Sequence, residues 1–287
     1  MLGRLLENNK KLSNGMIIPS IMLGSFQVKT SKIMQDMVSA AISSNCFGFD
    51  TSPSYGTENM LGKAIHEVCL NLGVKRNEIF ISDKIDGWQM FKEKGEVEKY
   101  VNKSLKNLGI DYLDLLLIHW PFENYLLNTW KCLERMYKSG KVKSIGLCNV
   151  NIRILDSLIK TGIEILPHVI QNEISPLRVC EEEVSYFQNM GIVVQAYSPL
   201  CRMIEPVKES MELRELAKKY KKSIPQVILR WHIDRGIIPI FTSTKFERIK
   251  SNVDIFDFNL SDEDIKIING LNQDYKIFPE SYGCPGF

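Results

Sequence analysis

The chain has 287 residues, of which 44% are hydrophobic and 24% charged, and 36 Lys and Arg against 34 Asp and Glu give a formal net charge of +2. This balance offers no basic field that would attract a nucleic acid. No stretch approaches the run of about 18 apolar residues that a membrane span needs. The seven cysteines contain no Cys-x-x-Cys pair, which argues against a disulfide framework and for a reducing compartment. We therefore expect a cytoplasmic globular protein without a nucleic-acid or membrane partner.

Short apolar runs alternate with amphipathic segments along the whole chain. The runs lie at 21–23, 47–49, 79–81, 113–118, 144–147, 169–171, 192–196 and 237–241. They are mostly uninterrupted, which is typical of parallel strands that are covered on both faces. Between them apolar residues recur every three or four positions, as in Met34, Met37, Val38, Ala41 and Ile42, and this spacing predicts helices. The alternation predicts a closed (β/α)8 TIM barrel that forms one domain over residues 1–287.

Local signals refine this architecture at both ends. A doubly wound open sheet is the alternative, but it usually begins with a glycine-rich phosphate turn, and the first run is followed by Gly24 alone. The Asn14–Gly15 pair predicts a β-hairpin over 11–18 that would plug the N-terminal mouth of the barrel. A helix-capping pattern at 261–264 predicts that a last helix begins there. We expect residues 275–287, which are rich in Pro and Gly, to form an irregular tail or lid.

Four polar side chains follow consecutive apolar runs: Asp50, Tyr55, Lys84 and His119. Each has a simple alternative role, as a turn cap, a loop aromatic, a solvated strand end or a rim histidine. The C-terminal ends of barrel strands meet on one face, however, so we expect these four side chains to converge. Their joint occurrence at matching positions favours a catalytic site.

The set suits delivery of a proton to a carbonyl oxygen. A free tyrosine titrates near 10, and an ammonium group about 4 Å away would stabilise the phenolate by roughly 4 kcal/mol at an effective dielectric of 20. We therefore expect Lys84 to lower the pKa of Tyr55, while Asp50 keeps the charge on Lys84. His119 would hydrogen-bond the carbonyl oxygen and orient it toward Tyr55. Such a site needs a hydride donor on the opposite side.

At these residues the sequence resembles the aldo-keto reductase family. The matching stretches lie at 49–58, 81–84, 115–121, 144–149, 195–200 and 247–249, with Gln171 between them, and they follow the family's order and spacing. The resemblance implies a (β/α)8 barrel that transfers hydride reversibly between NADP(H) and an aldehyde or ketone, with Tyr55 as the general acid. Asp50, Lys84 and His119 would complete the tetrad, and no metal is implied.

The resemblance also implies a set of cofactor contacts. The nicotinamide would contact Asn149, Gln171 and Tyr197, the pyrophosphate Ser198 and Leu200, and the adenosine 2′-phosphate Ser243, Arg248 and Asn252. Some neighbouring positions depart from the family pattern. Cys148 replaces a serine beside the carboxamide site, and Cys201 replaces a glycine in the loop over the pyrophosphate.

One departure bears on cofactor choice. Thr242 stands where the family has a lysine that contacts the 2′-phosphate. Arg248 remains, and a guanidinium can pair with a phosphate in bidentate fashion. The loss of one charge-assisted contact costs roughly 1.5–3 kcal/mol. We therefore expect NADPH to be the cofactor, with weakened discrimination against NADH.

Aromatic residues in the loops after the first, third and fourth strands, and in the tail, would line the substrate pocket. They are Phe26, which replaces a frequent tryptophan, Trp88, Trp120, Phe122, Tyr282 and Phe287. They predict an apolar carbonyl substrate, although Trp88 and Phe122 could simply pack their own loops.

The main hypothesis is a monomeric NADPH-dependent carbonyl reductase of the alcohol dehydrogenase (NADP+) type. A barrel that binds the cofactor as a regulatory or sensing module, with little catalysis, is the alternative, and the changes at Cys148, Cys201 and Thr242 keep it open. A metal-dependent hydrolase would need clustered His and Asp ligands that the sequence lacks. The natural substrate does not follow from the sequence.

Overall fold

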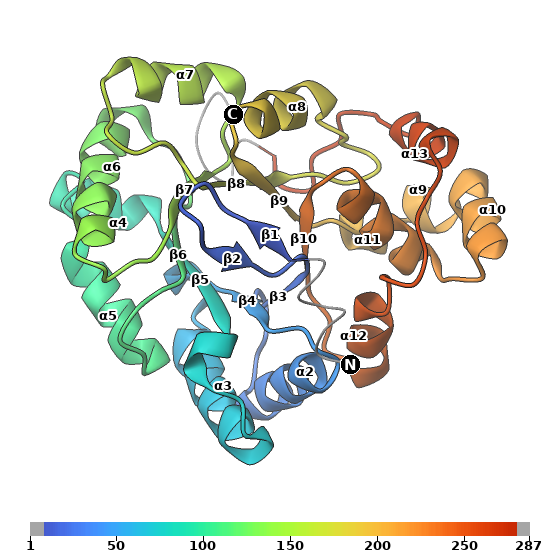
Figure 1. Cartoon of the computed structure of the whole chain (residues 1–287), viewed down its shortest axis with the longest axis horizontal. Helices are drawn as coiled ribbons and strands as arrows, with labels where there is room; N and C mark the ends of the chain where they lie inside the picture. The colour runs from blue at the N-terminus through green and yellow to red at the C-terminus, as the bar shows by residue number, and fades with distance from the viewer. Residues whose placement is uncertain (1–8, 280–287) are drawn as a thin grey trace.

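Eight parallel strands close into a barrel at the centre of the molecule, in the order β10-β3-β4-β5-β6-β7-β8-β9 (Figure 1). They are β3 Met22–Gly24, β4 Gly48–Asp50, β5 Phe80–Ile85, β6 Leu115–Ile118, β7 Ile145–Cys148, β8 Val169–Glu173, β9 Val193–Tyr197 and β10 Ile238–Phe241. The structure is a computed structural model that describes residues 9–279. The predicted (β/α)8 barrel is confirmed, and each predicted strand overlaps an observed one.

Helices surround the barrel and connect one strand to the next (Figure 1). They are α2 Ser31–Ser43, α3 Glu58–Leu72, α4 Gly87–Glu93, α5 Glu98–Leu108, α6 Glu123–Lys138, α7 Ile152–Lys160, α8 Glu181–Asn189, α9 Glu205–Lys208, α10 Met211–Tyr220, α11 Ile224–Asp234, α12 Phe246–Val253 and α13 Asp262–Asn269, with the 3-10 turns η1 Pro53–Tyr55, η2 Arg76–Glu78 and η3 Cys201–Met203. The predicted cap of α13 forms, since Ser261 Oγ accepts a hydrogen bond from the Asp264 amide. Among the helices of residues 9–279, none combines the length and apolar character of a membrane span.

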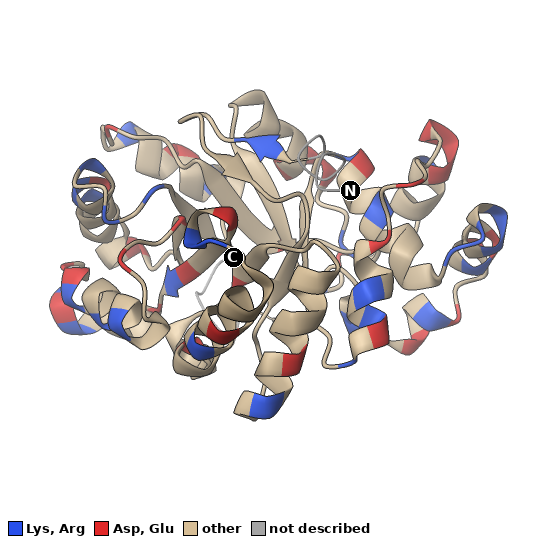
Figure 2. Cartoon of the chain, turned by 60° about the horizontal axis from the view of Figure 1, so that its bottom comes forward, with Lys and Arg blue, Asp and Glu red and all other residues tan. Residues whose placement is uncertain are grey.

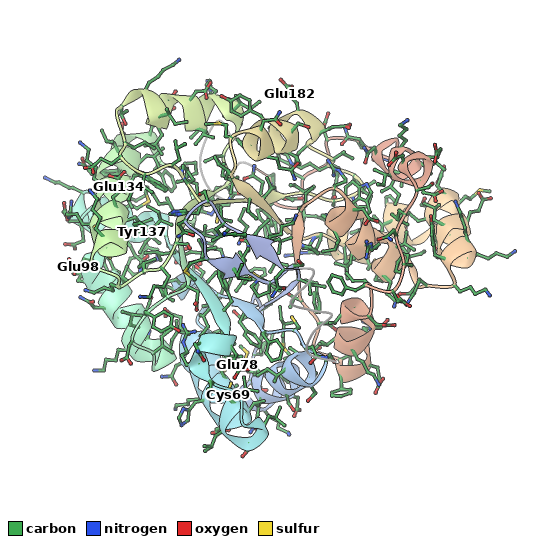
Figure 3. All side chains as sticks on the ribbon, in the orientation of Figure 1. Cys69, Glu78, Glu98, Glu134, Tyr137 and Glu182 are labelled. Carbon is green, nitrogen blue, oxygen red and sulfur yellow. The ribbon has the colours of Figure 1, made fainter. Side chains whose placement is uncertain are left out.

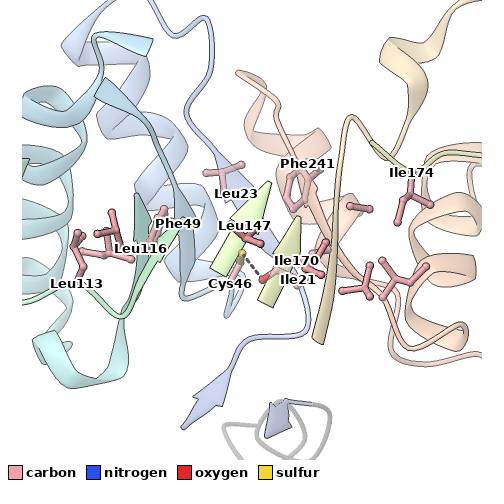
Figure 4. Close-up of a cluster of buried hydrophobic side chains, with 14 of the residues drawn as sticks. Ile21, Leu23, Cys46, Phe49, Leu113, Leu116, Leu147, Ile170, Ile174 and Phe241 are labelled. Carbon is pink, nitrogen blue, oxygen red and sulfur yellow. Dashed lines mark hydrogen bonds between the residues drawn. The ribbon is translucent and has the colours of Figure 1, made fainter. Parts of the chain in front are cut away.

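The strands bury side chains on both faces, which explains their uninterrupted apolar sequences. On β6, Leu115 and Leu117 belong to the cluster inside the barrel, and Leu116 and Ile118 belong to the larger cluster between strands and helices. Figure 4 shows part of this larger cluster. Within it, Cys46 Sγ donates a hydrogen bond to the backbone carbonyl oxygen of Ile21. Burial of each such aliphatic side chain contributes about 1.5–3 kcal/mol. The barrel is therefore held by two apolar layers.

The predicted hairpin forms and closes one mouth of the barrel. β1 Lys10–Lys11 pairs with β2 Ile17–Ile18 in antiparallel fashion across the Asn14–Gly15 turn, and Figure 1 shows both strands lying over the barrel. Leu12 and Ile18 are buried in the inner cluster. Asn14 Nδ2 donates to the carbonyl oxygen of Lys143, just before β7 begins. The hairpin therefore closes the N-terminal end of the barrel, and we look for the active site at the C-terminal end of the strands.

Lys and Arg residues are mixed with Asp and Glu residues along the outer helices, and neither sign dominates the ribbon drawn in Figure 2. Figure 3 places the labelled residues Glu98, Glu134 and Glu182 on the outer helices, away from the barrel axis. Glu134 is nevertheless buried, and its carboxylate accepts hydrogen bonds from the amides of Glu164 and Ile165. Glu98 and Glu182 are thus exposed to solvent, whereas Glu134 has a structural role.

Candidate active site

A buried ion pair occupies the C-terminal end of the barrel. Asp50 ends β4 and Lys84 lies within β5, and alternation along each strand points both side chains inward. Lys84 Nζ lies 2.6 Å from Asp50 Oδ1 and donates to the Thr51 carbonyl oxygen at 2.9 Å. Lys84 is only 1% exposed, so it is not a solvated strand end. Burial lowers the pKa of Lys84, but Asp50 outweighs this effect and the pKa is raised, so the ammonium stays charged, as predicted.

Two neighbouring amide and hydroxyl groups complete the surroundings of the carboxylate. Ser82 Oγ donates to Asp50 Oδ2 at 2.6 Å, and Gln171 Nε2 donates to the same oxygen at 3.1 Å. Gln171 comes from β8, three strands beyond β5 in the barrel. These donors, together with Lys84, fix the position of the Asp50 carboxylate.

Tyr55 lies against this ion pair. It ends the turn η1, which stops at Gly56 because that residue adopts a left-handed φ of 67°. The Tyr55 ring centroid is 5.0 Å from Lys84 Nζ and 5.8 Å from the His119 ring centroid. The structure thus brings together Asp50, Tyr55, Lys84 and His119, as the sequence predicted.

The prediction that Lys84 lowers the pKa of Tyr55 below its usual value is wrong. Burial raises the pKa of Tyr55 above its usual value, and this effect exceeds the lowering by Lys84. Asp50 also raises it, because the carboxylate offsets part of the ammonium charge that Tyr55 would otherwise experience. Tyr55 is therefore fully protonated near neutral pH and can only give a proton to a strong base.

Asp86 is a site residue that the sequence analysis missed. It follows β5 immediately, is buried, and has its Oδ1 atom 2.6 Å from His119 Nδ1. The predicted strand ended at 81, whereas β5 continues to Ile85, so the inward alternation of Ser82, Lys84 and Asp86 was not recognised. Extension of the strand through its polar residues would have revealed the position.

Three predicted nicotinamide contacts lie next to the tetrad. Asn149 has a φ of 57°, and its Nδ2 atom donates to the His119 carbonyl oxygen at 2.9 Å. Tyr197, at the end of β9, donates from its hydroxyl to Asn149 Oδ1 at 2.7 Å. Gln171 reaches Asp50 as described above, and burial raises the pKa of the neighbouring Cys148 thiol, which keeps it protonated. Asn149, Gln171 and Tyr197 therefore form one connected cluster with the tetrad.

The other predicted cofactor residues extend from this cluster along the barrel rim. They are Ser198 and Leu200 after β9, Thr242 and Ser243 after β10, and Arg248 and Asn252 on α12. Ser198 and Cys201 have left-handed φ values of 49° and 48°, so the loop after β9 is tightly folded. Thr242 Oγ1 donates to the Gly24 carbonyl oxygen. Arg248 is exposed and forms no ion pair with the rest of residues 9–279, so its guanidinium is available for an anion.

The predicted substrate-pocket residues separate into two groups. Phe26 lies 5.0 Å from Tyr55, and Trp120 stacks on His119 with ring centroids 6.1 Å apart. The other two pack on helices: Trp88 lies against Tyr100, and Phe122 lies against Phe91 and over Gly87. Tyr282 and Phe287 lie outside the described residues.

Two residues near Phe26 were not predicted. Phe278 packs against both Phe26 and Tyr197, with ring centroids 6.0 and 5.9 Å apart, and the Arg202 guanidinium lies 4.8 Å from its ring. The amide of Phe278 donates to Glu173 Oε2 at 3.1 Å, which fixes this part of the tail on the barrel. No sequence signal marked Phe278, because its position depends on the fold of an irregular segment.

Comparison with known proteins agrees with this geometry. The model of the Aldo/keto reductase family matches residues 20–273. Glyoxal reductase of Bacillus subtilis is 38% identical over 274 residues, which cover 96% of each chain. The crystal structure of Bombyx mori aldo-keto reductase AKR2E4 in complex with NADP superposes with a TM-score of 0.89 at 32% identity and covers 95% of each chain. An aldo-keto reductase from a deep-sea metagenome library, MGS-M4, gives a TM-score of 0.87 at 36% identity, with 94% of this chain and 97% of that chain covered. The chain belongs to the aldo/keto reductase family.

Proposed function

We propose that Tyr55 is the general acid with which this chain reduces an aldehyde or ketone, the activity of the family to which it belongs. NADPH, when bound, supplies the hydride. The observation that carries the assignment is the Tyr55 ring lying 5.0 Å from the buried ammonium of Lys84. Hydride addition turns the carbonyl oxygen into an alkoxide, which is a much stronger base than a phenolate. Proton transfer from Tyr55 is therefore favourable even with its raised pKa.

The ion pair would stabilise the phenolate that this transfer leaves. Lys84 lies against the Tyr55 ring, and its charge is fixed by Asp50 at 2.6 Å. Fixed charges in a dry site stabilise developing charge without reorganisation of solvent. Lys84 and Asp50 thus act as a unit that matters more for the transition state than for binding of the cofactor.

The residues around the tetrad have the chemistry that NADPH needs. Amide groups of Asn149 and Gln171 and the ring of Tyr197 would hold the nicotinamide, and Ser198 and Leu200 would line the pyrophosphate. Ser243, Arg248 and Asn252 would hold the 2′-phosphate, with Cys148 and Thr242 adjacent. The exposed Arg248, which has no anionic partner within residues 9–279, supports a site for a phosphate. We propose that Thr242 weakens the preference for NADPH over NADH.

Phe26 and Trp120 would form the substrate wall closest to Tyr55. Phe278 adds a third ring on the side of Tyr197, and these surfaces suit an apolar carbonyl compound. A wall role for Trp88 and Phe122 stays a prediction.

We further propose that the chain acts as a single-domain, cytoplasmic monomer of the alcohol dehydrogenase (NADP+) type. The cysteines of residues 9–279 are free thiols, which supports a reducing compartment. Lys and Arg residues are mixed with Asp and Glu residues along the ribbon of Figure 2, and the formal net charge is only +2, which supports a protein without a strong field of one sign.

The variant Tyr55→Phe tests the central role. It keeps the ring between Phe26 and His119 but removes the proton donor. We expect kcat for an aromatic aldehyde to fall by at least a hundredfold, because general acids contribute about 10² to 10⁴. NADPH affinity, measured by fluorescence titration, should change less than twofold.

Retention of activity in Tyr55→Phe would refute the assignment of the acid. Tight NADPH binding by the wild-type chain without oxidation in the presence of any of a broad panel of aldehydes would instead favour the cofactor-sensing alternative.

A further inference from the structure

Two buried carboxyl groups lie on the outer side of the barrel wall, behind the tetrad. Asp83 precedes Lys84 on β5, and alternation along the strand points it outward toward the helices, where it is 0% exposed. Glu58 is the first residue of α3, comes shortly after Tyr55, and is 6% exposed. The charge of Glu58 raises the pKa of Asp83, so the two carboxyl groups are neighbours. The pair therefore belongs to the two segments that carry Tyr55 and Lys84.

The close packing of α3 on α5 keeps this place dry. Gly62, one turn after Glu58, approaches α5 so closely that a Cβ atom there would meet the Leu108 carbonyl oxygen at 2.2 Å. Asn107 Nδ2, also on α5, donates to Glu58 Oε2 at 2.9 Å. The two helices thus hold the Glu58 side chain against the barrel.

Three oxygen atoms of the pair lack a donor. Within residues 9–279, Glu58 Oε1 and both side-chain oxygens of Asp83 are buried without a hydrogen-bond partner. Burial and Glu58 raise the pKa of Asp83, and together they exceed the opposite effects of Lys84 and Ser104. Two neighbouring carboxyl groups in a dry site do not both ionise readily, because each charge opposes the other.

The other groups around the pair do not supply the missing donor. Lys84 acts on Asp83 from the same strand, but its ammonium lies inside the barrel and is bound to Asp50. The groups of α4 and α5 that face the pair, or border the cavity of about 270 Å³ beside Glu58, are Trp88, Gln89, Tyr100, Lys103, Ser104 and Asn107. Of these, Lys103 carries a charge, and it is exposed, so water and salt screen it. A proton held between the two carboxyl groups turns one orphaned acceptor into a donor for the other.

We propose that Glu58 and Asp83 share a single proton, and that loss of this proton to water at alkaline pH is a switch that slows proton delivery by Tyr55. The effect on activity rests on the proposed function. With the proton in place the pair carries one negative charge, and without it a second negative charge lies directly behind Lys84. That charge opposes the phenolate that Tyr55 becomes when it protonates the substrate. Glu58 and Asp83 thus act through Lys84 and Tyr55 and do not touch the substrate.

Two variants hold the pair permanently in its one-charge state. In Asp83→Asn the carboxamide NH2 group can donate to Glu58 Oε1, and the pair keeps one negative charge at every alkaline pH. Glu58→Gln does the same from the other side, because the Asn107 donor retains the carboxamide oxygen and turns the NH2 group toward Asp83. Glu67→Gln is the matched control, since it neutralises an exposed acid on the same helix.

Urea unfolding detects the proton without any reference to activity. Carboxyl groups of the unfolded chain lose their protons near pH 4, so a native state that keeps one proton releases it on unfolding. Unfolding then becomes easier as the pH rises. Relative to Asp83→Asn, we expect the unfolding constant of the wild type to rise about tenfold per pH unit between about pH 5 and 7, and Glu67→Gln to follow the wild type. If Asp83→Asn does not fold, Glu58→Gln serves as the reference.

Two results of the unfolding experiment would overturn the shared proton. One is a ratio of unfolding constants that stays constant over this pH range. The other is a ratio that changes when tetramethylammonium replaces Na⁺ at constant ionic strength, because a bound metal cation would then hold the carboxylates together.

Kinetics tests the switch. We would measure kcat for benzaldehyde at saturating NADPH between about pH 6 and 10, a range in which Tyr55 keeps its own proton because burial raises its pKa. We expect the wild-type kcat to fall about tenfold above the pH at which the unfolding ratio levels off, the effect of a unit charge about 12 Å away at an effective dielectric of 20. Asp83→Asn and Glu58→Gln should lack this step, and their kcat at neutral pH should stay within twofold of the wild type.

The absence of an alkaline step in the wild type, or the same step in both variants, would overturn the switch. If the wild type reduces no aldehyde at any pH, the proposed function fails and the effect on activity fails with it. The unfolding ratio then still decides whether the pair holds a proton.

Discussion

Removal of the Lys84 ammonium would leave a buried carboxylate without its counter-ion. Lys84 and Asp50 are 1% and 4% exposed, and their charged atoms are 2.6 Å apart. Lys84→Met keeps the length of the side chain but leaves Asp50 with only the donors Ser82 and Gln171. Breaking a buried pair in this way costs about 3–5 kcal/mol. We expect the free energy of unfolding, measured in urea at pH 7, to fall by that amount and carbonyl reduction to be lost.

The double variant Asp50→Asn with Lys84→Met separates stability from catalysis. An Asn side-chain oxygen can keep the hydrogen bonds from Ser82 and Gln171, and no buried charge remains. We expect most of the lost stability to return, because replacement of both partners by neutral groups is often close to neutral. Activity should stay absent, since the ammonium beside Tyr55 is missing. The reasoning is refuted if Lys84→Met costs less than about 1 kcal/mol, or if the double variant is no more stable than the single one.

Two further predictions concern the cofactor and the pH dependence of stability. Arg248→Gln should weaken NADPH binding by roughly 1.5–3 kcal/mol, or about 10- to 150-fold, and leave NADH unchanged in a fluorescence titration, whereas Thr242→Lys should tighten NADPH alone; equal NADPH affinity in Arg248→Gln would contradict the phosphate site. His232 is fully buried, and burial lowers its pKa from 6.5 to about 4. The unfolded chain then binds the proton first, so stability is complete above pH 6.5 and falls by about 3 kcal/mol as the pH drops to about 4. Urea unfolding of His232→Gln should show a correspondingly flatter profile; a profile as steep as that of the wild type would exclude His232 as its source.

The barrel could be predicted from the sequence because its strands are covered on both faces. Leu115, Leu116, Leu117 and Ile118 are all buried, so the run is uninterrupted and easy to recognise. The Asn14–Gly15 turn likewise depends on local backbone chemistry and needs no tertiary information. The positions of Asp50, Tyr55, Lys84 and His119 after consecutive apolar runs then predicted that these side chains converge, and the structure brings them together.

Recognition of strands by uninterrupted apolar runs failed where a strand holds active-site residues. β5 continues through Ser82, Asp83 and Lys84, and these polar residues ended the apolar run on which the prediction depended. Because the predicted strand stopped too early, the sequence analysis missed Asp86, which points inward beside His119. Polar residues at a strand end are therefore better read as an extension of the strand with period two than as its end.

The pKa of Tyr55 shows why distance arguments from sequence fall short. Lys84 lies where the resemblance placed it, and its charge does lower the pKa of Tyr55, yet burial and Asp50 act in the opposite direction and prevail. The desolvation of a side chain depends on every neighbour that excludes water, including Phe26, and thus on packing that no motif encodes. The same holds for His119, whose Nδ1 atom lies 2.6 Å from Asp86 Oδ1, a contact that the sequence around His119 does not indicate. Motifs therefore identify which groups react, whereas the direction of each hydrogen bond and the charge of each group come from the folded surroundings.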